Sequence, residues 1–145
     1  MSYTYPFARP ALTADCAVFR RRKGKPELLL IERARDPHRG CWAFPGGFVD
    51  QDEDLEDAAR RELKEETGLV AGELLQAGAF GRPGRDPRGH TVTVVYTGEL
   101  TGACEPAAGD DAAKARWFPL DALPSLAFDH REILEFIIER GRAGG

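Results

Sequence analysis

Closely spaced glutamates between residues 47 and 69 are the part of this sequence with the clearest chemistry. Gly47 is followed by Glu53 and then by the run RELKEETGL at positions 61–69. Dense carboxylates supply the hard oxygen ligands that Mg²⁺ and Mn²⁺ prefer in proteins. This segment therefore predicts a site for a divalent metal ion, Mg²⁺ or Mn²⁺.

A helix must position these carboxylates. We expect it to start near Asp54 and to end at Thr67, because acidic residues gather at its start and Gly68 offers a C-terminal stop. On a helical wheel, Glu62 and Glu66 fall inside the apolar stripe of this helix. Burying carboxylates without partners costs on the order of several kcal/mol, so cations are expected beside them.

The opposite face of the same helix carries charges of a more ordinary kind. Glu56, Arg60 and Lys64 recur at four-residue spacing and are expected to face water as exposed ion pairs. The helix is thus predicted to have one solvated face and one face that meets a metal ion.

The elements around this helix follow from periodicity and turn residues. Strands are expected at 12–20 and 27–33, forming a hairpin, and at 73–81 and 90–100. Residues 101–113 are predicted to be loop, and a short turn is expected from Trp117. A last helix is expected to start with Asp129 and Glu132 as a capping box, to bury Ile133 and its neighbours, and to end at Gly141.

The spacing G-x5-E-x7-R-E-U-x-E-E-x-G-U, with U apolar, resembles the signature of the Nudix hydrolases, and every fixed position is matched. Trp42 and the run 45–47, Pro-Gly-Gly, precede it as they commonly do in that family. The resemblance implies an α+β fold: a Nudix-type α/β/α sandwich with a central mixed β-sheet and the Nudix loop-helix motif. It also implies hydrolysis of a nucleoside diphosphate linked to another group, by attack of water on phosphorus.

The same resemblance assigns roles to positions of this box. The implied metal ligands are the carbonyl of Gly47 and the carboxylates of Glu62, Glu65 and Glu66. The implied catalytic residues are Glu62, Glu66, Arg61 and Glu53. In these roles Arg61 orients the neighbouring glutamate, and Glu53 supports the loop and helix. We expect Glu62 or Glu66 to be the general base, and three later carboxylates stay open as alternatives: Glu105, Asp110 and Asp111.

Substrate choice is expected to come from outside the box. The loop 82–89 carries three arginines, which predict either a phosphate or ribose clamp or a solvated hairpin tip. Residues 85–91 and 126–130 resemble segments of Nudix proteins of the ADP-ribose pyrophosphatase type. The expected substrate contacts are Arg85, Arg88, His90 and Phe128.

The leading hypothesis from this resemblance is hydrolysis of ADP-ribose to AMP and ribose 5-phosphate. A house-cleaning nucleoside triphosphate pyrophosphatase is the enzymatic alternative. A non-catalytic module that senses ADP-ribose is a third interpretation, disfavoured by the intact box.

Composition indicates the number of domains, the kinds of partner and the cellular location that we expect. The chain has 145 residues, of which 42% are hydrophobic and 30% charged, as in one globular domain spanning residues 1–145. A formal net charge of −4 argues against nucleic-acid or anionic membrane partners. The three cysteines favour reduced thiols, and a cytoplasmic location is expected. The aromatic arm at residues 1–10 favours a homodimer.

Overall fold

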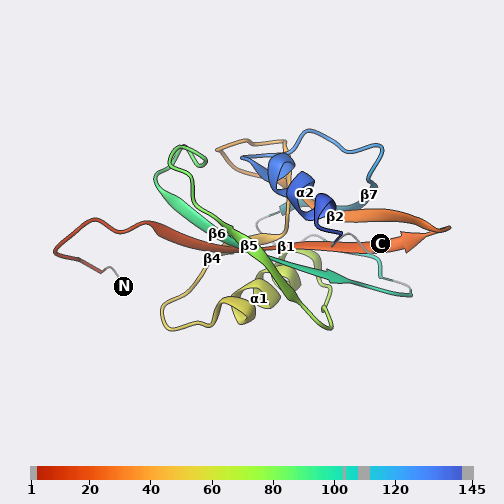
Figure 1. Cartoon of the computed structure of the whole chain (residues 1–145), viewed down its shortest axis with the longest axis horizontal. Helices are drawn as coiled ribbons and strands as arrows, with labels where there is room; N and C mark the ends of the chain where they lie inside the picture. Colours follow the sequence, from red (N-terminus) through yellow and green to blue (C-terminus); the bar gives the residue numbers. More distant parts are fainter. Residues whose placement is uncertain (1–2, 103, 108–111, 142–145) are drawn as a thin grey trace.

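A mixed β-sheet with one helix on each face forms the body of the molecule (Figure 1). The structure, a computed structural model, describes residues 3–102, 104–107 and 112–141. Its elements in chain order are β1 (Ala11–Arg22), β2 (Lys25–Arg33), β3 (Trp42–Ala43), β4 (Gly46–Phe48), α1 (Leu55–Thr67), β5 (Leu75–Phe80), β6 (Thr91–Glu99), β7 (Ala112–Pro119) and α2 (His130–Glu139). The expected α/β/α sandwich is confirmed.

Strand β1 is the central element of the sheet. The strand order is β3-β2-β1-β6-β5, with β4 paired to β1 and β7 paired to β2. The β1 and β6 strands run parallel, whereas the other pairs are antiparallel. Asp15 of β1 is opposite Gly46 of β4 on one side and Val95 of β6 on the other. The paired-glycine turn is therefore fixed to the middle of the sheet.

Alternate residues of β1 divide the core into two layers, because successive side chains of a strand point to opposite faces. Cys16 and Val18 pack toward α1. Ala17 and Phe19 pack toward α2. The residues that each helix contributes to its layer are Ala58, Ala59 and Leu63 from α1, and Ile133, Leu134 and Ile137 from α2.

Helix α1 matches its predicted boundaries. Its N-cap is Asp54, whose carboxylate accepts a hydrogen bond from the amide of Glu56. Gly68 follows the helix with a left-handed φ of 73°, and its amide donates to the carbonyl of Lys64. The hairpin of β1 and β2 and the two later strands, β5 and β6, are confirmed as well.

The prediction for residues 101–120 is wrong in part. From Ala112 to Pro119 the chain forms β7, which pairs antiparallel with β2, and the turn begins only at Leu120. Trp117 packs into the layer under α1, whereas Phe118 packs into the layer under α2. This strand depends on a partner about 80 to 90 residues earlier, so its own residues carry little local signal.

The predicted capping box of α2 is also wrong. The helix begins at His130 with Asp129 as its N-cap residue, but the Asp129 side chain makes no capping hydrogen bond. Its carboxylate binds Arg85 instead, and Glu132 pairs with Arg82. A charged partner on another segment has replaced the local cap. The expected inward face of Ile133 and its neighbours Phe136 and Ile137 is confirmed.

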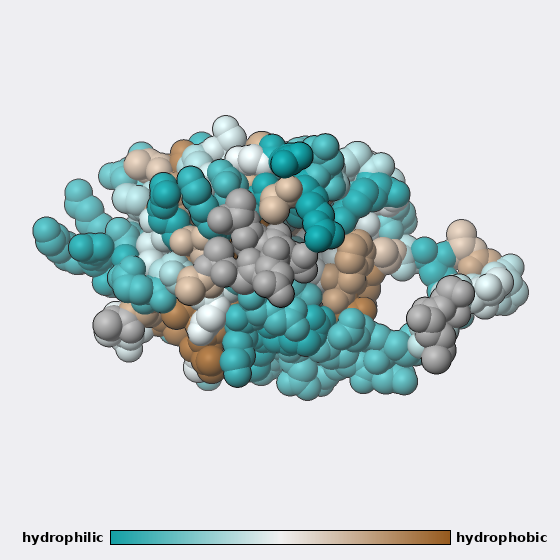
Figure 2. Space-filling model, turned by 180° about the vertical axis from the view of Figure 1, so that it is seen from behind, coloured by the Kyte–Doolittle hydropathy of each residue, from teal (hydrophilic) through white to brown (hydrophobic). Residues whose placement is uncertain are grey.

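The N-terminal arm stands off the body. It precedes β1 and extends beyond the edge of the sheet (Figure 1), and in the opposite view it lies at the right of a largely hydrophilic face (Figure 2). Tyr3, Tyr5 and Phe7 are all exposed, and the guanidinium of Arg9 stacks on the ring of Tyr5 at 3.6 Å. No helix in the described part of the chain is long and apolar enough to cross a membrane.

Candidate active site

A cavity of about 420 Å³ lies where α1, the paired-glycine turn and the N-terminal end of α2 meet. Its lining divides by chemistry into acidic residues and basic or aromatic residues. The acidic lining residues are Asp15, Asp50, Glu62, Glu66 and Asp86. The basic and aromatic lining residues are Arg33, Arg35, Arg85, Arg88, His130, Phe44, Phe48 and Phe128. Such a division suits a ligand that carries both phosphate charge and an apolar or ring-bearing part.

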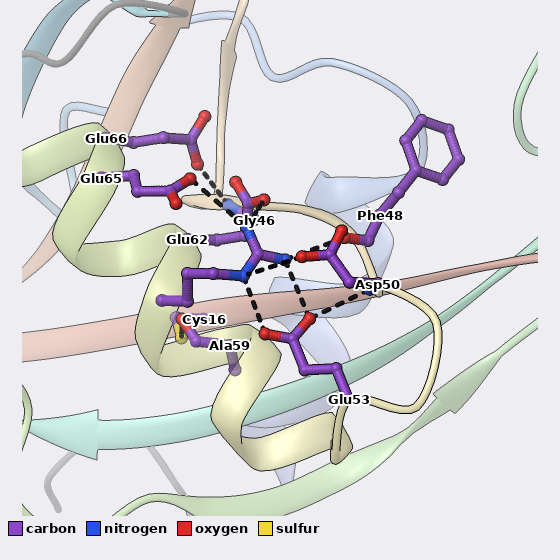
Figure 3. Close-up of polar contacts among 10 residues, drawn as sticks. Cys16, Gly46, Phe48, Asp50, Glu53, Ala59, Glu62, Glu65 and Glu66 are labelled. Atoms are coloured by element: carbon purple, nitrogen blue, oxygen red, sulfur yellow. Dashed lines mark hydrogen bonds and ion pairs between the residues drawn. The ribbon is translucent and has the colours of Figure 1, made fainter. Parts of the chain in front are cut away.

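Two glycines allow the turn before α1 to approach the helix closely. Figure 3 shows Glu62, Glu65 and Glu66 projecting from α1 toward Gly46. The Gly46 amide donates to Oε1 of Glu66 at 2.6 Å. A Cβ on Gly47 would lie 2.8 Å from the carboxylate atoms of Glu62. The sequence uses glycine here because a side chain would occupy the space of these carboxylates.

Arg61 gathers the carboxylates of the box. Its Nε and Nη2 donate to the two oxygens of Glu53 at 2.8 and 3.0 Å. Its Nη1 donates to Glu62 at 2.7 Å and to Glu65 at 3.3 Å, and its Nη2 also donates to the Phe48 carbonyl at 3.1 Å. The hydrogen bonds from Arg61 lower the pKa of Glu53 to about 2. One guanidinium thus holds the loop, the helix and two candidate ligands in register.

The two faces of α1 differ as predicted. The Glu62 side chain is 15% exposed and Glu66 is buried, whereas the Glu65 side chain is 57% exposed at the flank. On the outer face, Glu56 and Arg60 form an ion pair at 3.0 Å. Burial raises the pKa of Glu62, against the lowering effect of the neighbouring Arg61 charge. A raised pKa makes this carboxylate a stronger base.

The donors at this site match a hard divalent cation in kind. Glu62, Glu66 and Gly47 line the cavity. Glu65 lies on the same helix but is not among the cavity-lining residues. In this arrangement Glu62 and Glu65 accept hydrogen bonds from Arg61, and Glu66 accepts one from Gly46. Among the described residues, no three acidic, histidine or cysteine side chains converge closely enough to hold a metal ion.

The predicted substrate residues have separate surroundings. Arg88 and Phe128 line the cavity, and the Arg88 guanidinium lies 5.6 Å from the Phe128 ring. Arg85 reaches the cavity wall but is only 9% exposed, and it is paired with Asp129. His90 is exposed, outside the set of cavity-lining residues, and its Nε2 lies 2.8 Å from the Gly81 carbonyl. The structure thus brings Arg85, Arg88 and Phe128 together at the cavity, whereas His90 lies outside it.

Of the three alternative bases of the later loop, Glu105 is the one in the described part of the chain, and it is not among the described cavity-lining residues. Glu105 is exposed, and its carboxylate pairs with Arg20 at 3.6 Å. Asp110 and Asp111 lie outside the described residues. The box glutamates are thus the candidate bases that the described structure brings to the cavity.

Sequence reasoning missed a buried polar group in the wall of the cavity. Asp15 accepts a hydrogen bond from the Thr93 hydroxyl at 2.6 Å, and burial raises its pKa to about 6. His130 stacks on Phe44 at 4.6 Å, and its Nδ1 accepts the Phe44 amide at 3.2 Å. Burial lowers the pKa of His130 to about 3. An aspartate inside the buried strand 12–20 was the signal that could have revealed this group.

Arg33 is a second residue that the sequence did not single out. It ends β2, lines the cavity, and its guanidinium lies 5.0 Å from the Phe128 ring. Burial, followed by the nearby Arg88 charge, lowers its pKa. Two like charges therefore flank one aromatic ring at this wall, an arrangement that favours binding of an anionic group.

A glutamate-rich helix beside a paired-glycine turn, on a mixed sheet between two helices, is the arrangement expected of a Nudix protein. The chain matches the model of the NUDIX domain over residues 9–137, and it belongs to this family. The resemblance and the fold expected from it are thereby confirmed.

Two relatives and one solved structure illustrate the similarity. The chain is 43% identical over 129 residues to an ADP-ribose pyrophosphatase of Methanocaldococcus jannaschii, covering 89% of this chain and 73% of that protein. It is 38% identical over 133 residues to the ADPR responsive transcriptional repressor NtrR of Acinetobacter baylyi, covering 89% of this chain. That alignment covers 53% of the repressor, so the chain spans about half of its length.

The solved structure is the NUDIX domain of Shewanella oneidensis NrtR complexed with ADP ribose. It superposes with a TM-score of 0.85 at 33% identity and covers 94% of this chain and 93% of that domain. The chain is thus similar in sequence both to an enzyme and to a transcriptional repressor.

Proposed function

We propose that this protein hydrolyses ADP-ribose to AMP and ribose 5-phosphate, with Mg²⁺ or Mn²⁺ as cofactor. The observation that carries the proposal is the cavity itself, which the box carboxylates Glu62 and Glu66 line together with Arg88 and Phe128. The catalytic relative named above and the ADP-ribose complex of a similar domain support this choice of substrate.

In the proposed mechanism the box would hold a divalent metal ion, which when bound would neutralise phosphate charge and lower the pKa of water. Glu62, Glu65, Glu66 and the Gly47 carbonyl are its proposed ligands. Arg61 fixes the orientation of Glu62 and Glu65 through the Nη1 hydrogen bonds. Glu53 in turn holds Arg61 through both of its carboxylate oxygens. These residues contribute positioning and electrostatic stabilisation.

Glu62 is the proposed general base. Its carboxylate lines the cavity beside Gly47, and its burial favours the protonated form that results when it takes a proton from water. Glu66 is the alternative, but its Oε1 is engaged by the Gly46 amide. On the substrate side, Arg33 and Arg88 line the cavity, and their proposed role is to neutralise the charge of the diphosphate.

A binding module for ADP-ribose is a second candidate, because the repressor NtrR is also similar to this chain. The box of this chain is complete at every fixed position, which favours catalysis. Tight binding of ADP-ribose without release of AMP in the presence of Mg²⁺ would support the binding module.

A substrate panel tests the proposal. It compares ADP-ribose with NADH, diadenosine polyphosphates, nucleotide sugars and nucleoside triphosphates by kcat/KM. The proposal predicts the highest kcat/KM for ADP-ribose and loss of turnover when EDTA removes the metal ion. A clear preference for nucleoside triphosphates would contradict the substrate but not the box assignment.

We also propose a homodimer in which the N-terminal arm contacts a second copy. The arm exposes Tyr3, Tyr5 and Phe7, which are costly to leave in water together. Light scattering after size exclusion should give twice the 15.9 kDa chain mass, and a monomer mass at micromolar concentration would contradict the dimer.

A further inference from the structure

Arg85 and Asp129 form a buried, two-point ion pair between the loop 82–89 and the start of α2. Arg85 Nε donates to Oδ2 of Asp129 at 2.9 Å, and Nη2 donates to Oδ1 at 2.6 Å. The two side chains are 4% and 11% exposed. Arg85 Nη1 also donates to the Thr91 carbonyl at 3.4 Å. Three of the five guanidinium donors are thus used within the protein.

The residue before Asp129 has an unusual backbone. Phe128 has a φ of 53°, in the left-handed region that a bulky residue rarely adopts. Its ring meets the edge of His38 at 4.8 Å and lies 5.0 Å from the Arg33 guanidinium. Such a conformation persists only when surrounding contacts hold it in place. The residue that follows Phe128, Asp129, is held by the two-point ion pair with Arg85.

Two further residues of the loop 82–89, Asp86 and Arg88, also line the cavity. Asp86 is buried and accepts three hydrogen bonds from Arg88: the amide at 2.9 Å, Nε at 3.1 Å and Nη2 at 2.8 Å. The Arg88 guanidinium is thereby held between the rings of Phe48, at 5.1 Å, and Phe128, at 5.6 Å. Arg85 thus contacts Asp129, and Phe128, the residue before Asp129, contacts Arg88. Arg85 and Arg88 both belong to the loop 82–89, so these contacts join the loop to the start of α2 at two points.

We propose that the Arg85–Asp129 pair is a positioning element that holds Phe128 and Arg88 in the cavity wall and so determines substrate affinity. The proposal rests on the proposed function of this cavity. Arg85 acts through the other two residues, because its donors are turned toward Asp129 and Thr91. The hydrogen bonds of Arg85 go to Asp129 and Thr91, neither of which belongs to the box, so we expect the pair to affect KM and not kcat.

The test compares Asp129→Asn with a matched control, Arg82→Gln. The control breaks the Arg82–Glu132 pair, which joins the same loop to the same helix but is 69% and 67% exposed. With ADP-ribose as substrate, we expect Asp129→Asn to raise KM about tenfold with kcat within about threefold, since a buried charge pair is costly to break. Arg82→Gln should leave both constants within about twofold, as for exposed pairs.

Phe128→Leu keeps the ion pair and removes the ring, and it should raise KM by a similar factor. The double variant Asp129→Asn with Phe128→Leu should raise KM no further than either single variant, because both act through one wall. Circular dichroism confirms folding of each variant, and Arg85→Lys keeps a buried cation if Asp129→Asn fails to fold. Arg85→Lys should then show the same selective rise in KM.

Three outcomes would overturn the proposal. They are an unchanged KM in the folded Asp129→Asn or Arg85→Lys protein, multiplicative effects in the double variant, or a fall in kcat as large as the rise in KM. A lower KM in Asp129→Asn would instead indicate that the released Arg85 binds substrate directly. Failure of the wild-type protein to bind or hydrolyse ADP-ribose would contradict the proposed function, which separates the two claims.

Discussion

The amide of Gly46 and the carboxylate of Glu66 are joined by a 2.6 Å hydrogen bond across 20 residues of sequence. Gly46 is itself fixed to β1 opposite Asp15, so this bond ties α1 to the centre of the sheet. The neighbouring Gly47 faces Glu62 at similarly close range. A side chain at Gly46 would therefore meet β1, whereas a side chain at Gly47 would meet Glu62 of α1.

Gly46→Ala and Gly47→Ala should fail in different ways. A Cβ at Gly46 would meet the Ala14 carbonyl at 2.6 Å and the Asp15 Cα at 2.8 Å, and backbone cannot yield, so we expect a loss of about 1–3 kcal/mol in the free energy of unfolding. The three atoms nearest to a Cβ at Gly47 all belong to the carboxylate end of the Glu62 side chain. Gly47→Ala should therefore lower kcat with little change in Tm.

Urea unfolding and steady-state kinetics on both variants check this difference. Gly72→Ala is the control, since a Cβ there meets nothing within 4 Å. Equal loss of stability in Gly46→Ala and Gly47→Ala would contradict the assigned contacts.

Adjacent arginines on α1 should have unequal importance. Arg61 binds Glu53, Glu62 and Glu65, whereas Arg60 pairs with Glu56 on the outer face and with the Ala71 carbonyl. Because Arg61 orients proposed metal ligands, Arg61→Ala should lower kcat/KM by about 10–100-fold.

Arg60→Ala removes the same side chain one position earlier and should lower kcat/KM by less than about threefold, because its ion pair is partly exposed. Parallel assays at saturating Mg²⁺ make the comparison. A similar loss in both variants would show that Arg61 has only a structural role.

Glu62→Gln should fold normally and lose most of kcat. The amide has the same shape as the carboxylate but cannot take a proton from water, and loss of a general base costs about a hundredfold or more. The assay is ADP-ribose turnover at saturating Mg²⁺, with circular dichroism as the control for folding. Near-native kcat in the folded protein would remove Glu62 from the role of base.

The buried pair of Asp15 and His130 should give opposing effects of pH on stability. The folded pKa of His130 is lowered from 6.5 to about 3, so between these values the unfolded chain binds more protons and stability is lost as pH falls. The folded pKa of Asp15 is raised from 3.8 to about 6, so in that window the folded protein binds more protons and stability is lost as pH rises.

Urea unfolding at pH 4, 5 and 6 separates the two contributions. His130→Gln should flatten the loss of stability on acidification, whereas Asp15→Asn should make this loss steeper. Identical pH profiles in the two variants would contradict the opposite shifts.

Local chemistry was enough to predict much of the fold. The caps at Asp54 and Gly68, the hairpin of β1 and β2, and the inward Glu62 and Glu66 all follow from residues close together in sequence. Strand β7 did not follow, because its pairing with β2 is decided by distant residues. The same limit explains the false capping box at α2.

The arginines of the cavity wall show most clearly that sequence alone does not reveal which distant residues pair. The sequence placed three arginines in one loop but could not tell which of them is paired with a distant carboxylate. Arg82 pairs with Glu132 at the surface, Arg85 with Asp129 in the interior and Arg88 with its own neighbour Asp86. Arg33 escaped notice because it comes to this wall from the end of β2, far from the loop in sequence.

The central claim is that water attacks a phosphorus atom of ADP-ribose in the cavity beside Glu62. Hydrolysis of ADP-ribose in ¹⁸O-labelled water, followed by mass spectrometry of the products, tests it most directly. The account predicts AMP and ribose 5-phosphate in equal amounts, with one ¹⁸O atom per turnover in a product phosphate. Label at a sugar carbon, or bound ADP-ribose that releases no AMP, would contradict the account.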